Sequence, residues 1–200
     1  MDIITIQGGA LYTNCYMVYG EGSDTCVAID PGFQPEPILE AALCRGKKIE
    51  AIFLTHGHFD HVGGVKALAE ETGCKVYIHK EDLSLPNRLT LGTIPYTDHY
   101  DEGDTVQLAG LSFHILHTPG HTPGGVCILC EEAMFAGDTL FAGTCGRTDL
   151  PGSSPSAMGQ SLKRLAQLEG EYTVLPGHGE ASTLSQEKRS NPYLQVTGWN

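Results

Sequence analysis

The stretch His56-Gly57-His58-Phe59-Asp60-His61 decides how this chain is interpreted, because four of its six side chains can bind a metal ion. It directly follows residues 51–55, an apolar and β-branched run that predicts a buried strand. His56 and His58 can face the same way from an extended segment, whereas Asp60 and His61 lie where the chain turns into the next helix. The spacing predicts a loop that can serve two adjacent metal ions.

A competing interpretation is that Asp60 merely caps a helix that begins near Val62. Three of the nine histidines of the chain, together with a carboxylate, lie in this one short turn. That density favours the metal loop over the helix cap.

Composition limits the classes of function that this chain can have. Its 200 residues suffice for one domain, residues 1–200, with a continuous core. A formal net charge of -12, with only 12 Lys and Arg, disfavours nucleic acid and anionic membranes as partners. The sequence shows neither a signal peptide nor a run of about twenty apolar residues, and its seven cysteines are odd in number and scattered. We therefore expect a cytoplasmic protein without a nucleic-acid or membrane partner.

Hydrophobic patterning predicts the order of the elements. Strands are predicted at residues 3–7, 15–19, 25–30, 49–55, 75–79, 105–108, 111–117, 125–130, 133–137 and 174–175, and helices at 36–44, 62–72, 155–168 and 184–190. Residues 81–102 contain two prolines and little periodicity, which predicts a long loop. Strand-rich halves with interleaved helices predict two sheets packed face to face with helices outside.

Three further metal-capable residues each follow a strand-like run in a loop rich in Gly and Pro. They are His121 in Thr118-Pro119-Gly120-His121, Asp138 in Phe135-Ala136-Gly137-Asp138, and His178 in Leu175-Pro176-Gly177-His178. A neighbouring glycine permits close approach, so that ligands at the ends of rigid strands can be aimed at one point. Each residue alone fits a turn or cap equally well, but jointly they predict a shared site.

The series His-x-His-x-Asp-His, then His, Asp and His, resembles the metallo-β-lactamase superfamily, and within it the glyoxalase II-like hydrolases (hydroxyacylglutathione hydrolases), over nearly the whole chain. The resemblance implies an α/β fold: a four-layer αβ/βα sandwich of two mixed sheets, without the C-terminal helical domain of full-length glyoxalase II. It also implies that one metal is held by His56, His58 and His121, the second by Asp60, His61 and His178, and that Asp138 bridges both. Asp30 resembles the aspartate of the family's first motif, which supports the ligands without binding metal.

A ligand set of five imidazoles and two carboxylates is compatible with two divalent ions, zinc first, with iron or manganese as alternatives. Two such ions can share a water and generate a metal-bridging hydroxide that attacks a carbonyl. Asp60, beside that hydroxide, is expected to orient it and relay its proton. The family resemblance then implies a metal-dependent thioester hydrolase acting on a small-molecule thioester.

Arg147 is the candidate substrate-binding residue. Glyoxalase II enzymes have a similar loop after the bridging aspartate, with a basic residue that grips a carboxylate of the glutathione thioester. The alternative is that Arg147 is solvated or pairs with Asp149, where those enzymes have a tyrosine. This departure leaves the natural thiol open, while the tail at residues 191–194 resembles that of small bacterial members of the group.

Gly146-Arg147-Thr148-Asp149 also resembles the loop of persulfide dioxygenases, which use this fold with a single iron. His56, His121 and Asp138 would then hold that iron. The run at residues 137–141 favours the hydrolase, and Asp138 itself argues against a true β-lactamase, which generally lacks the bridging aspartate. Nuclease branches need basic surfaces or further domains, and a metal-binding module without catalysis would need an evident partner-binding segment.

The other candidate residues are given structural roles. Cys127 and Cys130 are predicted to point to opposite faces of a strand, and Cys145 and Phe59 to pack, the latter beneath the metal loop. Core or supporting roles are expected for the remaining histidines, His79, His99, His114 and His117.

Overall fold

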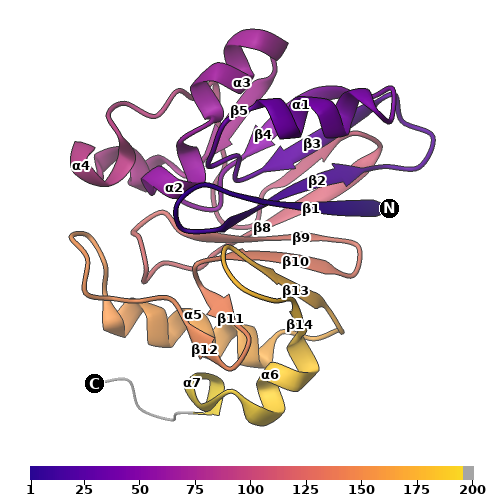
Figure 1. The fold of residues 1–200 in the computed structure, drawn as a ribbon. Helices are drawn as coiled ribbons and strands as arrows, with labels where there is room; N and C mark the ends of the chain where they lie inside the picture. The colour runs from indigo at the N-terminus through magenta and orange to yellow at the C-terminus, as the bar shows by residue number, and fades with distance from the viewer. Residues whose placement is uncertain (196–200) are drawn as a thin grey trace.

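A computed structural model describes residues 1–195 of the chain. The chain forms four layers, in which two six-stranded sheets lie face to face between two layers of helices (Figure 1). This is the predicted α/β architecture, and the prediction of two sheets with helices outside is confirmed.

The first sheet is mixed and comes from the N-terminal half of the chain. Its strands β1, β2 and β3 are antiparallel, and β3 to β6 are parallel. In spatial order they are β1 (Asp2–Gly8), β2 (Thr13–Tyr19), β3 (Thr25–Ile29), β4 (Lys48–Phe53), β5 (Lys75–Ile78) and β6 (Asp98–His99). The apolar faces of α1 (Glu36–Leu43) and α3 (Val65–Thr72) bury residues such as Ile38 and Leu68 against its outer side.

The second sheet comes from the C-terminal half, and only β10 and β13 are parallel in it. In spatial order its strands are β14 (Ser182–Thr183), β13 (Thr173–Pro176), β10 (Ala133–Gly137), β9 (Val126–Cys130), β8 (Leu111–His117) and β7 (Thr105–Leu108). Ser154 caps α5 (Pro155–Gln167) by accepting from the Ala157 amide, as its position before Pro155 predicts. This helix, α6 (Leu184–Ser190) and α7 (Pro192–Gln195) lie below the sheet in Figure 1.

Aromatic side chains from both sheets fill the space between them. Phe53 of β4 meets Phe113 of β8 edge to face, with ring centroids 5.0 Å apart, and Tyr16 of β2 meets Phe135 of β10 at 5.4 Å. All four are buried. Because this core fixes one sheet against the other, the loops at the ends of their strands meet along one edge.

Two predicted elements differ in the structure. The helix predicted at residues 62–72 is split into α2 (Phe59–Val62) and α3, because the Gly63-Gly64 pair is a poor helix former and packs against another loop, where the Gly64 amide donates to the Pro31 carbonyl. The loop predicted at residues 81–102 contains a 3₁₀ helix, η1 (Lys80–Ser84), the short helix α4 (Asn87–Thr90) and β6. Strands β11 (Leu140–Phe141), β12 (Thr144–Cys145) and β14 are too short to leave a periodic pattern.

Several single-residue predictions are also settled. Cys127 and Cys130 do belong to different apolar clusters on the two sides of the sheet. Phe59, predicted to pack beneath the metal loop, is 38% exposed. The core or supporting roles predicted for His99 and His114 are wrong, because both side chains lie on the surface. In residues 1–195, no helix is both long and apolar enough to cross a bilayer.

Candidate metal centre

The strand ends of both sheets deliver all seven predicted ligands to one edge of the molecule. Two follow β4 in a loop, two lie in α2, and the others come from the loop between β8 and β9 and from the loops after β10 and β13. In chain order these residues are His56 and His58, Asp60 and His61, His121, Asp138, and His178. The interpretation of Asp60 as a helix N-cap is wrong, because Asp60 lies inside α2 and His58 occupies the N-cap position of that helix.

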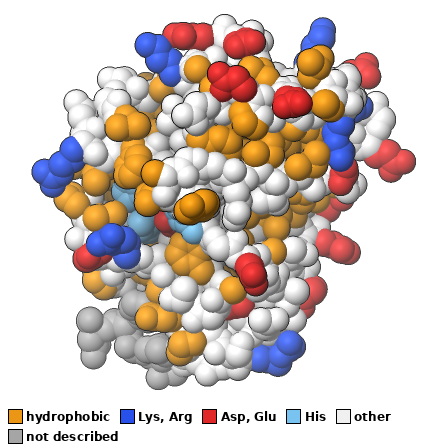
Figure 2. Space-filling model, in the orientation of Figure 1, with side chains coloured by type: hydrophobic (Ala, Val, Ile, Leu, Met, Phe, Trp, Pro, Cys, Tyr) orange, Lys and Arg blue, Asp and Glu red, His pale blue; other side chains and the backbone are white. Residues whose placement is uncertain are grey.

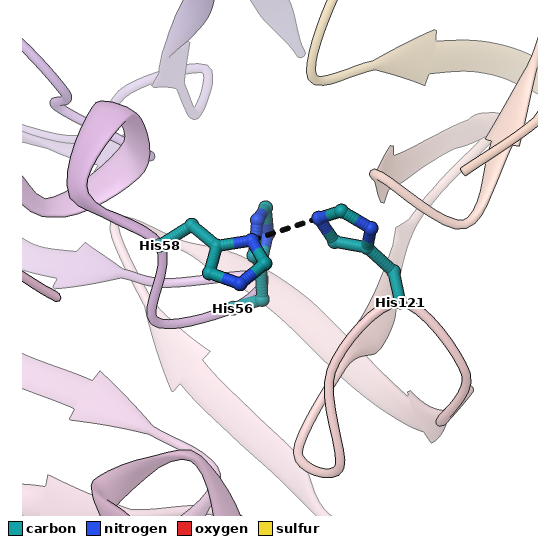
Figure 3. A group of neighbouring side chains, drawn as sticks. All are labelled: His56, His58 and His121. Atoms are coloured by element: carbon teal, nitrogen blue, oxygen red, sulfur yellow. Dashed lines mark hydrogen bonds between the residues drawn. The ribbon is translucent and has the colours of Figure 1, made fainter. Parts of the chain in front are cut away.

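Three imidazoles form the first group. Ring nitrogens of His56, His58 and His121 lie within 4.8 Å of one another, and Nδ1 of His58 is 2.8 Å from Nε2 of His121. Figure 3 shows His56 and His58 rising from one loop and His121 reaching toward them from another. Two of these side chains are thus fixed by β4 of the first sheet and one by β8 and β9 of the second.

The second group is formed by Asp60, His61 and His178, whose ligand atoms also lie within 4.8 Å of one another. Asp138 lies between the two groups. Its Oδ1 is 3.5 Å from Nε2 of His61, and its Oδ2 is 3.4 Å from Nε2 of His121 and 3.7 Å from Nε2 of His178. One carboxylate therefore faces both groups at once.

Hydrogen bonds hold four of the imidazoles by Nδ1 and leave Nε2 directed into the site. The partner atoms are Thr55 Oγ1 for His56 at 3.2 Å, Asp30 Oδ2 for His61 at 2.9 Å, the Arg147 carbonyl for His121 at 2.9 Å and the Leu11 carbonyl for His178 at 3.1 Å. A carbonyl or carboxylate accepts only from a protonated nitrogen, so in the neutral form of these imidazoles Nε2 carries the lone pair that a metal would bind. This is the arrangement that metal-ligating histidines commonly have.

Unpaired atoms at the centre test whether a metal fits. Within residues 1–195, Nε2 of His56, His58 and His61 and Oδ1 of Asp138 are buried without a hydrogen-bond partner. Buried polar atoms are normally paired, because leaving one unpaired costs about 1–3 kcal/mol. Imidazole nitrogens and carboxylate oxygens around one point satisfy the donor chemistry of divalent metals. The residues present therefore fit the metal that their spacing predicts.

The pKa values of the predicted ligands are shifted in different directions. Burial and the neighbouring imidazoles hold the pKa of His56 well below its ordinary value and lower the pKa of His58 to about 4. Burial alone would raise the pKa of Asp138, but the charge of His61 outweighs it and keeps that pKa low. Burial would lower the pKa of His61, but the charges of Asp30 and Asp138 outweigh it and raise that pKa well above its ordinary value. Because metal binds neutral imidazole and ionised carboxylate, a metal held by His61 would displace its Nε2 proton.

Asp30 supports the centre from the end of β3. It accepts from the Thr55 amide at 2.7 Å, from the Thr55 hydroxyl at 2.6 Å and from Nδ1 of His61 at 2.9 Å. Because the Thr55 hydroxyl donates to Asp30, it is free to accept from Nδ1 of His56. A single buried carboxylate thus orients His61 directly and His56 through Thr55.

Residues of β2 that carry no sequence signal complete the support. Thr13 donates to Oδ2 of Asp60 at 3.1 Å, and the side-chain amide of Asn14 donates to the Pro176 and Gly179 carbonyls on either side of His178. The first strands of one sheet therefore tie down the last ligand loop of the other. The local sequence could not predict these contacts, because Asn14 and Gly179 are 165 residues apart in the chain.

Glycine at position 177 is required by close packing. A Cβ atom there would lie 2.3 Å from Oδ1 of Asp138 and 2.6 Å from Cε1 of His61, closer than real contacts allow. The expectation that a flanking glycine permits close approach of ligands is met at this position.

Asp82 is a positioning residue that the sequence did not reveal. It is fully buried in η1, where its Oδ2 accepts from the Gly57 amide at 2.7 Å and the Thr122 hydroxyl at 2.9 Å, and its Oδ1 accepts from the Gly124 amide. Gly57 separates the two ligands of the first loop, and Thr122 follows His121. Burial raises the pKa of Asp82 to about 6, although the three hydrogen bonds that it accepts oppose this rise.

Asp82→Asn is expected to lower the affinity of the first group for metal by about 10- to 100-fold, because its NH2 group would face either the Gly124 amide or the Gly57 and Thr122 donors, and every one of these groups donates. Competition with a chromophoric zinc chelator measures that affinity, and Glu81→Gln on the exposed side of η1 is the matched control. Equal affinities in Asp82→Asn and the control would show that Asp82 does not position the ligands.

The centre opens into a cavity of about 600 Å³. In Figure 2, histidine side chains are visible in a hollow surrounded by hydrophobic ones. Arg147 lines this cavity, but both it and Asp149 are exposed and form a two-fold ion pair, Nε to Oδ1 at 2.6 Å and Nη2 to Oδ2 at 2.8 Å. The alternative predicted for Arg147, pairing with Asp149, is therefore present, and its substrate role stays a prediction.

Fold and site together define a metal-dependent hydrolase fold with a histidine-rich metal site. Residues 8–178 match the metallo-beta-lactamase superfamily, and the chain belongs to that family.

The relatives of the chain differ in their activities. Hydroxyacylglutathione hydrolase GloC of Haemophilus influenzae is 33% identical over 97% of this chain and 98% of its own. Three solved structures are similar over nearly the whole chain. TTHA1623 in a di-iron-bound form is 42% identical with a TM-score of 0.82, and the match covers 95% of this chain and 99% of that one. The B3 metallo-beta-lactamase BLEG-1 is 33% identical with a TM-score of 0.87, over 98% of this chain and 100% of that one. ETHE1 from Myxococcus xanthus is 30% identical with a TM-score of 0.83, over 96% of this chain and 84% of that one.

Proposed function

We propose that this protein is a thioester hydrolase of the glyoxalase II (hydroxyacylglutathione hydrolase) reaction type, which cleaves small-molecule thioesters at a dinuclear metal centre and whose natural thiol is open. The observation that carries the proposal is the pair of ligand groups with Asp138 between them, open to the cavity. The similarity to GloC supports the reaction type, and the di-iron form of TTHA1623 supports the occupancy. Zinc is the metal we expect, with iron or manganese as alternatives.

Two divalent ions held by these seven residues would lower the pKa of a water between them from about 15.7 toward 7 and would polarise the thioester carbonyl. Asp60 lines the cavity and orients the attacking water by accepting its hydrogen bond. Burial opposes ionisation of Asp60, but the hydrogen bond with His178 outweighs it and keeps its pKa low. Asp60 therefore acts at neutral pH as an ionised acceptor.

The proposed reaction needs neither a nucleophilic side chain nor a strong general acid from the protein. Burial raises the pKa of the Cys145 thiol to about 11, so this neighbour of the centre is no nucleophile at neutral pH. A thiol leaving group has an ordinary pKa of about 8.5 and departs as the thiolate without a strong general acid. Hydrolysis consequently depends on the ligands and on Asp60.

The proposal is tested by supplying the purified protein with S-lactoylglutathione, with its neutral analogue S-lactoyl-N-acetylcysteamine, with glutathione persulfide under oxygen, and with a chromogenic β-lactam. We expect thioester cleavage and neither oxygen uptake nor β-lactam opening. Oxygen uptake by a protein with one iron would assign it to the persulfide dioxygenases instead. Cleavage of the β-lactam alone would make it a β-lactamase despite Asp138.

A further inference from the structure

The wall of the cavity outside the metal centre is mostly apolar, with Thr144 and Arg147 as its polar side chains. Its large apolar side chains come from five separate segments, and they are Leu11, Phe59, Leu89, Phe141 and Leu150. Leu11 is 51% exposed and Phe59 38%, although large apolar side chains favour burial. Such side chains gathered around one hollow mark a binding surface for an apolar group.

The cavity offers little positive charge from side chains other than the ligands. Within residues 1–195, Arg147 is the only Lys or Arg that lines it, and residues 196–200 contain neither residue type. Both carboxylate oxygens of Asp149 already engage the Arg147 guanidinium. A substrate carboxylate that approaches Arg147 therefore meets a neutral pair and must also come close to the charge of Asp149.

We propose that the cavity selects thioesters whose acyl and thiol parts are uncharged and apolar over glutathione thioesters, and that Asp149 sets this preference by neutralising Arg147. The inference rests on the proposed function and narrows its substrate class. Glutathione carries two carboxylates and one ammonium group, and a site that binds it tightly needs cations free to pair with those carboxylates. This cavity instead supplies apolar contact.

Titration calorimetry on the metal-loaded protein tests the preference with two ligands that cannot be hydrolysed. S-hexylglutathione and S-hexyl-N-acetylcysteamine share the hexyl group and the thioether sulfur and differ in the charged part. We expect the neutral ligand to bind at least about fivefold more tightly than S-hexylglutathione. This factor corresponds to about 1 kcal/mol, the repulsion in water between two like unit charges about 4 Å apart, here a glutathione carboxylate and Asp149. Tighter or equal binding of S-hexylglutathione would overturn the inference.

Asp149→Asn tests the role assigned to the ion pair. Because the substitution frees Arg147, the affinity for S-hexylglutathione should rise by about fivefold at low salt, and this gain should disappear at high salt. The affinity for the neutral ligand should not change. The double variant Arg147→Gln with Asp149→Asn should return to the wild-type affinity. Asp24→Asn, an exposed aspartate in the turn before β3, gives the same change in net charge as a control.

An Asp149→Asn protein that binds S-hexylglutathione no better than Asp24→Asn would overturn the role of Asp149. These binding results do not depend on turnover. A protein that cleaves thioesters but prefers S-hexylglutathione contradicts only this inference, whereas one that cleaves no thioester contradicts the proposed function whatever its affinities.

Discussion

Asp138→Ala is expected to abolish thioester hydrolysis and to leave the purified protein with at most one metal ion per chain. Asp138 is the carboxylate that faces both ligand groups, with one oxygen toward His61 and the other toward His121 and His178. Its removal takes a ligand from both metals, and Lewis-acid catalysis contributes several kcal/mol, so kcat/KM should fall by at least about a thousandfold.

Metal analysis and turnover should be measured on the same preparation, with circular dichroism to show that the variant is folded. Asp104→Ala, an exposed aspartate in the turn before β7, is the control and should retain both metals and activity. An Asp138→Ala protein that keeps two metals and full activity would rule out the bridging role.

Asp30→Asn is expected to lower the free energy of unfolding by about 2–4 kcal/mol and metal affinity by about 10- to 100-fold. Asp30 has a φ of 53°, which asparagine also tolerates, so the change costs the backbone little. The NH2 group of asparagine must face either the Thr55 amide, which now donates to Oδ1, or the Thr55 hydroxyl and Nδ1 of His61, which now donate to Oδ2. In either orientation a buried donor meets another donor, and the carboxylate charge beside His61 is lost.

Thermal melts with and without a chelator separate the two effects of Asp30→Asn. A stability loss that survives chelation reports the buried hydrogen bonds, and an additional loss in the loaded protein reports the weakened metal site. The exposed Asp24→Asn serves as the control. A melting temperature and metal affinity equal to those of the control would show that Asp30 has no supporting role.

The sequence predicted the parts of this site that are encoded locally. The spacing from His56 to His61 and the Gly-Pro loops around His121, Asp138 and His178 stand out because each follows an apolar run that ends a strand. The alternation of apolar runs also predicted two sheets covered by helices. Each sheet buries both of its faces, one against the other sheet and one against helices, so its strands are apolar on both sides.

Supporting residues escaped prediction because tertiary contacts define them. Asp82 looks like any acidic residue near a helix start, yet it is buried and bonded to amides 25 and 42 residues away. Phe59 lies between two ligands, which suggested burial, but α2 turns its side chain toward the cavity. The split at Gly63 and Gly64 likewise depends on packing against the loop that contains Pro31.

The number of metal ions per chain tests the central claim, a dinuclear centre built from seven side chains, most directly. Plasma mass spectrometry of the purified protein, with chelated and reloaded samples beside it, should find close to two divalent ions per chain and thioester hydrolysis that rises with the second ion. A saturating content of one iron per chain, with full activity at that content, would contradict the account.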